Sequence, residues 1–141
     1  MGAAKIKQFL GILISVHTGL EILSTMALNA TDSALVVFRP DYLSYLSLSH
    51  FQETLLLSKT PILGIVPTFV SKQSRHAREA LDLMEENYSD LILQSIPRRV
   101  VLQDAMVAGK PIIDYLPNSD VSHAFLTLAQ EVLSRAKTVA A

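Results

Sequence analysis

The sequence contains no cysteine. This absence excludes disulfides, zinc knuckles, redox pairs and thiol nucleophiles, and it fits a cytosolic protein. Charge is also sparse, because only 18% of the 141 residues are charged and the formal net charge is −1. A nearly neutral chain exerts no global attraction on nucleic acid or on acidic lipid. No apolar run approaches the roughly 20 residues needed to span a bilayer, so we expect a cytoplasmic protein without a membrane partner.

The sequence motifs of several catalytic chemistries are missing as well. There is no G-x-x-x-x-G-K-[ST] phosphate loop, no G-x-G-x-x-G and no G-x-S-x-G. Gly109-Lys110 lacks the first glycine and the hydroxyl of a phosphate loop, so it fits a helix stop followed by a solvated lysine. The histidines lack metal-site spacing, and His17, the one at a strand end, is more simply a turn residue. We therefore predict no catalytic residue and no metal ligand.

What the sequence does contain is a regular alternation of apolar runs and helical stretches. The apolar runs are rich in β-branched residues and do not alternate with polar ones, which predicts strands buried on both faces of a parallel sheet. These runs are Ile12–Val16, Ala34–Phe38, Ile62–Val66, Leu91–Ile96 and Pro111–Tyr115. Strand–helix units in series predict an α/β fold, with a doubly wound, mainly parallel sheet flanked by helices. No repeat or linker interrupts the pattern, so we expect a single domain over residues 1–141.

Capping residues mark where the helices begin and end. The predicted boundaries are the capping box Thr18-Gly-Leu-Glu21, Asp41 for a second helix through Leu57, Ser71 or Ser74 for a third, a short helix from about Val101 to Ala108 that stops at Gly109, and Asn118 or Ser119 for the last. In the last helix Asp120 occupies the first turn, and Arg135 and Lys137 lie near the end. All three charges favour the helix dipole.

Basic residues gather near the carboxyl ends of two predicted strands, the edge at which open α/β sheets bind ligands. The stretch "SKQSRHAR" places Lys72, Arg75 and Arg78 within two helical turns, and Arg98-Arg99 follow a strand on the same edge. Such a cluster can hold phosphate groups without reading a base sequence. A surface helix that opens with basic residues by chance fits the composition equally well.

Three long segments carry a family resemblance. They are "GLEILSTMALNATDSALVVFRPDYLSYLSLSHFQETL", "PILGIVPTFVSKQSRHAREAL" and "SDLILQSIPRRVVLQDAMVAGKPIIDYLPNSDVSHAFLTLAQEVL". From about Gly11 to Lys137 the chain resembles the C-terminal half of the ParA/MinD family of partition ATPases, which are P-loop NTPases of the SIMIBI class. The region with the Walker A phosphate loop has no counterpart in the chain. The resemblance implies an incomplete P-loop NTPase fold.

The stretch "ILISVHTG" at residues 12–19 lies where this family carries its Walker B strand. Ser15 occupies the place of the Walker B aspartate, and His17-Thr18 that of the following prolines. A serine hydroxyl cannot supply the negative charge that orients a magnesium-bound water. The family's phosphate loop, its two lysines and its switch I aspartate would all precede Met1. ATP and Mg²⁺ are the family's cofactors, but the resemblance implies that this chain does not hydrolyse ATP by itself, and no cofactor is assigned to it.

The resemblance also implies two binding surfaces. Adenine recognition in the family corresponds here to Thr68, Pro97 and Arg98. Non-specific DNA contact corresponds to Lys72, Arg75, Arg78, Arg98 and Arg99. Gln73 and Val101 fall where relatives often have arginine, so the implied DNA surface is reduced.

In the family, the phosphate-loop strand lies between the Walker B strand and the strand that matches Ala34–Phe38. Without it, we expect that the chain either closes this gap locally or self-associates through the open edge. The leading functional hypothesis is a truncated ParA-like protein related to ATP-dependent plasmid or chromosome partitioning. An accessory module that docks on a full-length ParA/MinD-type ATPase or its partner is the alternative. An unrelated enzyme using His17 or Asp41 is a third hypothesis, for which no nucleophile–base pair is visible.

Overall fold

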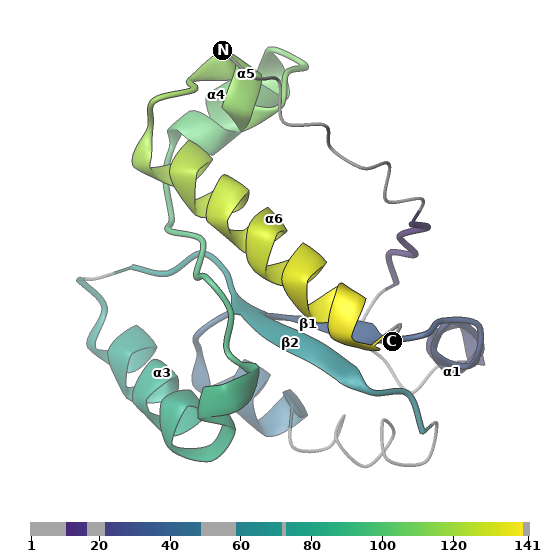
Figure 1. The fold of residues 1–141 in the computed structure, drawn as a ribbon. Helices are drawn as coiled ribbons and strands as arrows, with labels where there is room; N and C mark the ends of the chain where they lie inside the picture. Colours follow the sequence, from purple (N-terminus) through teal and green to yellow (C-terminus); the bar gives the residue numbers. More distant parts are fainter. Residues whose placement is uncertain (1–10, 17–21, 49–58, 72, 140–141) are drawn as a thin grey trace.

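The computed structural model describes residues 11–16, 22–48, 59–71 and 73–139 (Figure 1). Its elements in chain order are α1 (Ile22–Asn29), β1 (Ala34–Phe38), β2 (Ile62–Pro67), α3 (Arg75–Tyr88), a 3-10 turn η1 (Ser89–Leu91), α4 (Val101–Val107), α5 (Ile112–Tyr115) and α6 (Asp120–Val139). Residues 42–48 are also helical. No helix among the described residues is both long enough and apolar enough to cross a membrane.

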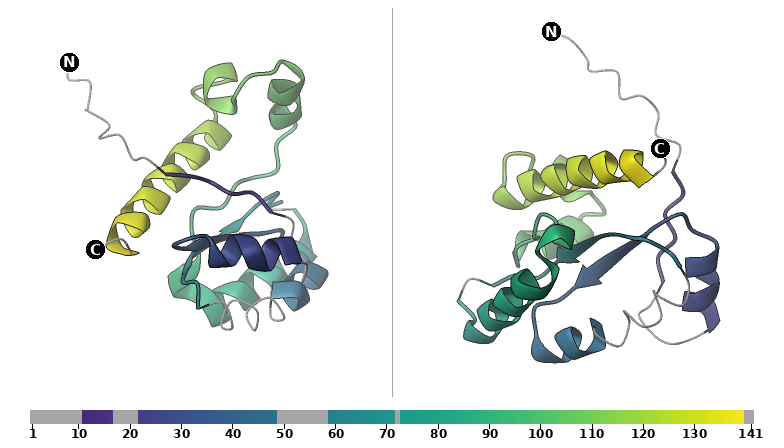
Figure 2. Two further views of the ribbon diagram at one scale, coloured as in Figure 1. Left: turned by 90° about the vertical axis from the view of Figure 1, so that its right-hand side faces the viewer. Right: turned by 60° about the horizontal axis from the view of Figure 1, so that its bottom comes forward.

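β1 and β2 form a parallel sheet, in which Val36 pairs with Ile65 and Phe38 with Pro67. This confirms the predicted strands at Ala34–Phe38 and Ile62–Val66, the second extended by one residue. α3 covers one face of the sheet and α6 covers the other, as Figure 2 shows. The predicted α/β class, a parallel sheet flanked by helices, is therefore confirmed.

Of the predicted strand at Leu91–Ile96, Leu91 belongs to the turn η1, and the rest is an extended segment that runs beside β2 without forming a continuous strand. The amide of Leu93 donates to the carbonyl oxygen of Ile65 at 2.9 Å, and the amide of Ile96 donates to that of Pro67 at 2.8 Å. Between them the amide of Gln94 donates to the Glu131 carboxylate of α6 at 2.6 Å. The side chain from α6 thus replaces a sheet partner in the middle of this segment.

Two other predicted strands are wrong. Residues 11–16 form no strand and are exposed, with Ile12 90% accessible, because no described strand lies beside them to accept their backbone hydrogen bonds. The run Pro111–Tyr115 contains helix α5. Pro111 has a φ of −58° at its N-cap, and its carbonyl oxygen accepts from the amides of Asp114 and Tyr115 at 3.0 and 2.9 Å. A short apolar run carries no periodicity that distinguishes a strand from a buried helical turn.

Most helix boundaries agree with the capping residues. Ser74, not Ser71, caps α3, and its hydroxyl accepts from the amide of Ala77 at 3.2 Å. At the start of α6, the Ser119 hydroxyl accepts from the amide of Ser122 at 3.1 Å. Gly109 follows α4 with a left-handed φ of 65°, as a C-terminal glycine does. The capping box at 18–21 and positions 49–57 of the second helix lie outside the described residues.

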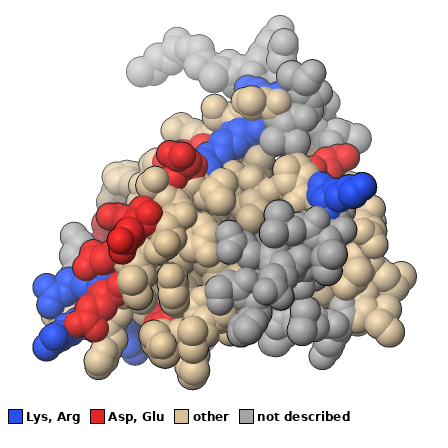
Figure 3. Space-filling model, turned by 90° about the horizontal axis from the view of Figure 1, so that it is seen from below, with Lys and Arg blue, Asp and Glu red and all other residues tan. Residues whose placement is uncertain are grey.

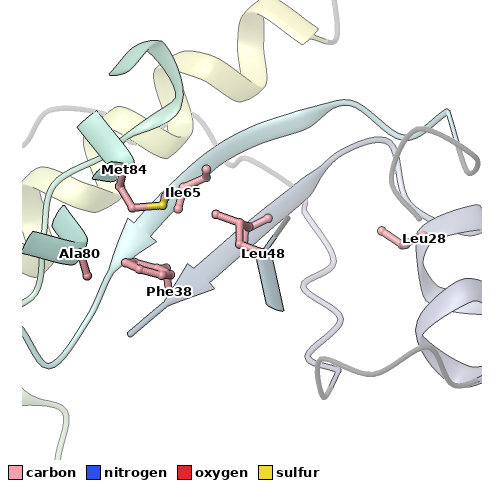
Figure 4. Packing of buried hydrophobic residues seen from close by; sticks show 7 residues of the cluster. Leu28, Phe38, Leu48, Ile65, Ala80 and Met84 are labelled. Atoms are coloured by element: carbon pink, nitrogen blue, oxygen red, sulfur yellow. The ribbon is translucent and has the colours of Figure 1, made fainter. Parts of the chain in front are cut away.

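Two apolar clusters hold the fold together. In the first, Phe38 of β1 and Ile65 of β2 pack with Ala80 and Met84 of α3 (Figure 4). In the second, Val66 of β2 packs with residues from the following segment, α4, α5 and α6, which are Leu93, Ile96, Ala105, Ile112, Val121 and Ala124. Because Ile65 and Val66 point to opposite faces, β2 is the buried centre of the described structure.

Candidate functional site

The carboxyl ends of β1, β2 and the segment after Ile92 meet at one edge. The amide of Thr68 donates to the carbonyl oxygen of Phe38 at 2.7 Å, which places Thr68 beside the end of β1. On the other side, Val70 and Pro97 form a parallel bridge. The structure therefore brings together the three residues implied for adenine recognition, with Thr68 and Pro97 half-buried and Arg98 exposed.

An open hollow lies next to this edge, between the residues that follow Val70 and the 98–100 segment. Its lining residues are Val70, Ser71, Gln73, Arg98, Arg99 and Val100. The amide of Arg98 donates to the carbonyl oxygen of Val70 at 2.9 Å, and this bond holds the two segments side by side. The hollow therefore presents two guanidinium groups together with a hydroxyl and an amide, which are donors suited to a phosphate or a base edge.

The Arg99 side chain forms an ion pair with Asp120. Its guanidinium donates from Nε to Oδ1 of Asp120 at 3.3 Å and from an Nη group to Oδ2 of the same carboxylate. Asp120 is the first residue of α6. Both side chains remain about half exposed, at 45% and 56%, so this is a surface pair of modest strength that an incoming anion can displace.

The remaining basic residues lie on α3, outside the lining of the hollow. Nε of Arg75 donates to Oε1 of Glu79 at 2.8 Å. This hydrogen bond holds the pKa of the Glu79 carboxyl below its ordinary value. Arg78 is exposed and makes no ion pair with any residue that the structure describes. Lys72 lies outside the described residues.

The charge on α3 is mixed. After Arg75 and Arg78 the helix carries acidic residues, which are Glu79, Asp82, Glu85 and Glu86. Figure 3 shows basic and acidic side chains together over the same part of the surface. Any contact with a polyanion is therefore confined to the first turns of α3 and the neighbouring edge, because the later turns repel phosphate.

A second feature of this edge, which no sequence motif indicates, is an exposed aromatic ring beside a guanidinium group. Phe69 has a left-handed φ of 54° and is 60% exposed. The guanidinium carbon of Arg39, at the end of β1, lies 5.9 Å from the centre of its ring. Both residues follow an apolar run in the sequence, but only the structure shows that the turn carries Phe69 outward to Arg39. An exposed aromatic ring with a stacked guanidinium is a platform on which a planar base can stack.

The described residues include neither a strand at the Walker B position nor a cluster of three or more metal-ligating side chains. Ser15 lies in the exposed segment 11–16, outside any strand. No group of three or more histidine, aspartate or glutamate side chains that could hold a metal occurs in the described part of the chain. His17 and Thr18 lie outside the described residues.

Several known proteins are similar to this chain, although no family model matches it. Among curated proteins, it is 29% identical over 128 residues to the sporulation initiation inhibitor protein Soj of Bacillus subtilis, with 86% of this chain and 51% of Soj covered. It is 26% identical over 131 residues to the chromosome partitioning protein ParA of Caulobacter vibrioides, with 88% of this chain and 49% of ParA covered.

Among solved structures, the cell division ATPase MinD of Pyrococcus furiosus matches with a TM-score of 0.67 and 25% identity, over 82% of this chain and 48% of MinD. The septum site-determining protein MinD of Pyrococcus horikoshii, solved with Mg-ADP, matches with a TM-score of 0.68 and 25% identity, over 86% of this chain and 49% of MinD.

The two MinD structures show that the chain has part of a P-loop NTPase α/β fold. Within this class, the chain is a homologue of the ParA, Soj and MinD partition ATPases. It spans about half the length of the curated relatives it matches, consistent with the resemblance to their C-terminal half.

Proposed function

We propose that this chain is a cytoplasmic, ParA-like component of DNA partitioning that contacts DNA without reading its sequence. The observation that carries the proposal is the exposure of Arg78 and Arg98, each of which has no acidic partner among the described residues. Arg75, Arg99 and Lys72 are the further candidates. Homology to proteins named for chromosome partitioning supports the assignment. Exposed guanidinium groups hold phosphates by charge and by forked hydrogen bonds.

The test is retention of the full chain on immobilised duplex DNA as a function of salt. The Arg75→Ala/Arg78→Ala variant removes two basic groups from α3 and is expected to lower the slope of log affinity against log salt by about 2. The matched control is Lys110→Ala/Lys137→Ala, which changes the net charge equally at exposed positions away from this edge. Equal retention of the α3 variant and the unmodified chain at low salt would sink the proposal.

We also propose that the chain, a single ParA-like domain, does not hydrolyse ATP by itself. The support is that Ser15, in the place of the Walker B aspartate, carries no negative charge, and that the described residues include no group of three or more acidic or histidine side chains that could hold a metal. Phosphate release by the purified chain is therefore expected to equal that of a buffer blank. Release that saturates with Mg-ATP and follows the protein through purification would contradict this expectation.

Nucleotide binding at the edge formed by Thr68, Pro97 and Arg98 does not require that the chain hydrolyse ATP. A ligand at about 100 times its dissociation constant adds roughly 2.7 kcal/mol to the stability of a folded protein. We propose that this edge binds the base side of the nucleotide, so millimolar Mg-ATP should raise the melting midpoint and Arg98→Ala should reduce the shift. An unchanged midpoint would mean that the edge has no nucleotide site.

A second candidate function is an accessory module that docks on a full-length ParA/MinD-type ATPase or on its partner. The observation in its favour is the large number of exposed apolar side chains on α1 and β1. Mixing the chain with an excess of a full-length relative should then yield a stable hetero-oligomer on size-exclusion chromatography. Elution of the two proteins at their separate positions would exclude it.

A further inference from the structure

Phe69 is an exposed aromatic residue that the fold holds in an uncommon backbone conformation. Its φ of 54° lies in the left-handed region that bulky residues rarely adopt. Before it, the amide of Thr68 donates to the carbonyl oxygen of Phe38 at 2.7 Å. After it, the amide of Val70 donates to the carbonyl oxygen of Ile96 at 3.1 Å. Because both neighbours of Phe69 are fixed, to β1 on one side and to the extended segment on the other, the turn between them is held in place.

The position of this ring contributes nothing to the apolar core. Phe69 is 60% exposed and belongs to neither apolar cluster of the described structure. An aromatic ring that stays in water forgoes the free energy of burial, and the left-handed φ adds a further cost. Backbone strain of this kind persists where the surrounding structure imposes it, and it gathers at binding sites. We therefore looked for a ligand that the ring fits.

Arg39 lies over this ring, with its guanidinium carbon 5.9 Å from the ring centre. The Arg39 side chain is 70% exposed, and its Nε is 3.7 Å from Oδ2 of Asp41, which is a long contact for an ion pair. The other carboxylate oxygen of Asp41 accepts from the amide of Ser44 at 2.8 Å, at the start of the 42–48 helix. Asp41 thus caps this helix and holds Arg39 only weakly. The guanidinium remains available to a phosphate or to the face of a base.

Further basic groups lie close to the ring in the chain. Val70, which follows Phe69, lines the hollow together with Arg98 and Arg99. Its carbonyl oxygen accepts from the amide of Arg98 at 2.9 Å. The Arg98 side chain is exposed and forms no ion pair with any residue that the structure describes. Proteins hold single strands of nucleic acid with this combination, in which bases stack on aromatic rings and basic groups follow the phosphates.

A duplex does not present its bases to such a ring. The bases of a duplex are paired and stacked on one another, so a base reaches a protein side chain only after it leaves the stack, at a cost in free energy. An unpaired strand offers its bases without this cost. Stacking on an aromatic ring also tolerates any base, because every base has a flat π face. An exposed ring beside basic groups therefore favours the unpaired strand.

We propose that Phe69 and Arg39 form a stacking site for an unpaired base of single-stranded DNA, with a neighbouring phosphate held by Arg98. The choice of DNA rests on the proposed contact with DNA, and the stacking site adds a preference for unpaired strands that charged side chains alone do not provide. The site is distinct from the edge implied for adenine recognition at Thr68 and Pro97, because it holds a base within a strand and uses neither a triphosphate nor Mg²⁺.

The first test uses fluorescence. The chain contains no tryptophan, so Phe69→Trp introduces a single indole ring at the proposed site. The full chain with this substitution is titrated with oligo(dT) of about 15 nucleotides, a length within the usual site size of single-strand binding. A base that stacks on the indole quenches its emission, so we expect saturable quenching by oligo(dT) and little quenching by the same strand annealed to oligo(dA). No quenching by oligo(dT), or equal quenching by the duplex, overturns the proposal.

The second test measures affinity for labelled oligo(dT) by fluorescence anisotropy. Phe69→Ala should weaken binding about tenfold, whereas Phe69→Tyr retains the ring and should bind like the unmodified chain. Phe69→Gly also removes the ring but suits the left-handed φ, so it answers the same question if Phe69→Ala is unstable. Tyr115→Ala removes a ring that is 39% exposed on α5 and is the matched control, with unchanged binding expected. Urea unfolding of each variant checks the fold.

The remaining outcomes separate this proposal from the others. If oligo(dT) binding survives both ring removals but is lost in Arg75→Ala/Arg78→Ala, α3 alone holds DNA, so the stacking proposal is wrong and the proposed function stands. If oligo(dT) binding needs Phe69 while duplex retention does not need α3, the stacking site stands and the proposed duplex contact fails. Equal quenching of Phe69→Trp by millimolar AMP would assign the ring to free nucleotides, and tighter binding of oligo(U) would assign it to RNA. Either result overturns the proposal.

Discussion

The guanidinium of Arg135 on α6 donates to the carbonyl oxygen of Leu63 in β2 at 3.1 Å. The same group reaches the carbonyl oxygens of Leu91 and Ile92, at 3.3 and 3.4 Å. Arg135 therefore joins the last helix to β2 and to the extended segment beside it. The sequence suggested only that this charge favours the helix dipole, but its main contacts are with the backbone of the sheet region.

Replacement of Arg135 by alanine is expected to lower the free energy of unfolding by about 2 kcal/mol, because three carbonyl oxygens lose a charged donor. Urea denaturation monitored by circular dichroism measures the loss. Lys137→Ala, two residues further along α6 and exposed, should change stability by less than about 0.5 kcal/mol. Similar losses in the two variants would mean that the bonds to the sheet region contribute nothing specific.

How far the sequence predicts the fold depends on where each element finds its partners. β1 and β2 were predictable, because their β-branched runs pair with each other. The run at residues 11–16 is similarly apolar but has no strand beside it among the described residues, and strand formation requires a neighbour to accept its hydrogen bonds. For α5, the decisive factor is the turn geometry at Pro111, which an apolar pattern does not encode.

Helix α3 allows a direct test of which serine caps it. Ser74 accepts from the amide of Ala77, whereas Ser71 contributes only its backbone carbonyl, to the amide of Ser74. Ser74→Ala is expected to lower the free energy of unfolding by about 1 kcal/mol, and Ser71→Ala should have little effect. Thermal unfolding of the two variants gives the comparison. The reverse order of stabilities would show that the helix begins earlier in solution.

The Arg75–Glu79 pair makes a prediction about pH. The hydrogen bond from Arg75 lowers the pKa of Glu79 in the folded chain. The contribution of the pair to stability is thus present above the unfolded-state pKa and is lost as the pH falls through the folded-state pKa. A carboxyl-carbon NMR titration should show the Glu79 pKa rising in Arg75→Ala and unchanged in Arg78→Ala. If the Glu79 pKa is the same in the unmodified chain and in both variants, the pair does not persist in solution.

The candidate site was predictable in part. Thr68, Pro97 and Arg98 meet at one edge because parallel strands end together, which the order of strands already implies. The ion pairs that the charged side chains form could not be predicted from the sequence. Asp120 lies 21 residues after Arg99, and only the chain path from α4 through α5 brings the two together. The outward turn at Phe69 likewise depends on a backbone angle.

The Arg99–Asp120 pair leads to a prediction about the proposed DNA surface. Asp120 neutralises Arg99 and presents its own negative charge beside the hollow, so it should oppose an incoming phosphate. Asp120→Asn is therefore expected to tighten DNA binding about twofold at low salt, equivalent to roughly 0.5 kcal/mol for an exposed pair. Fluorescence anisotropy with a labelled duplex measures the change.

Two comparisons show whether the gain comes through Arg99. Asp114→Asn makes the same change in net charge at an exposed position on α5 that has no ion pair within the described residues. In an Arg99→Ala background, Asp120→Asn should produce a smaller gain than it does with Arg99 present. If Asp114→Asn tightens binding as much as Asp120→Asn, the gain reflects overall charge, and Arg99 has no special place in the contact. If only Asp120→Asn acts, and only with Arg99 present, the ion pair limits how strongly this edge holds a phosphate.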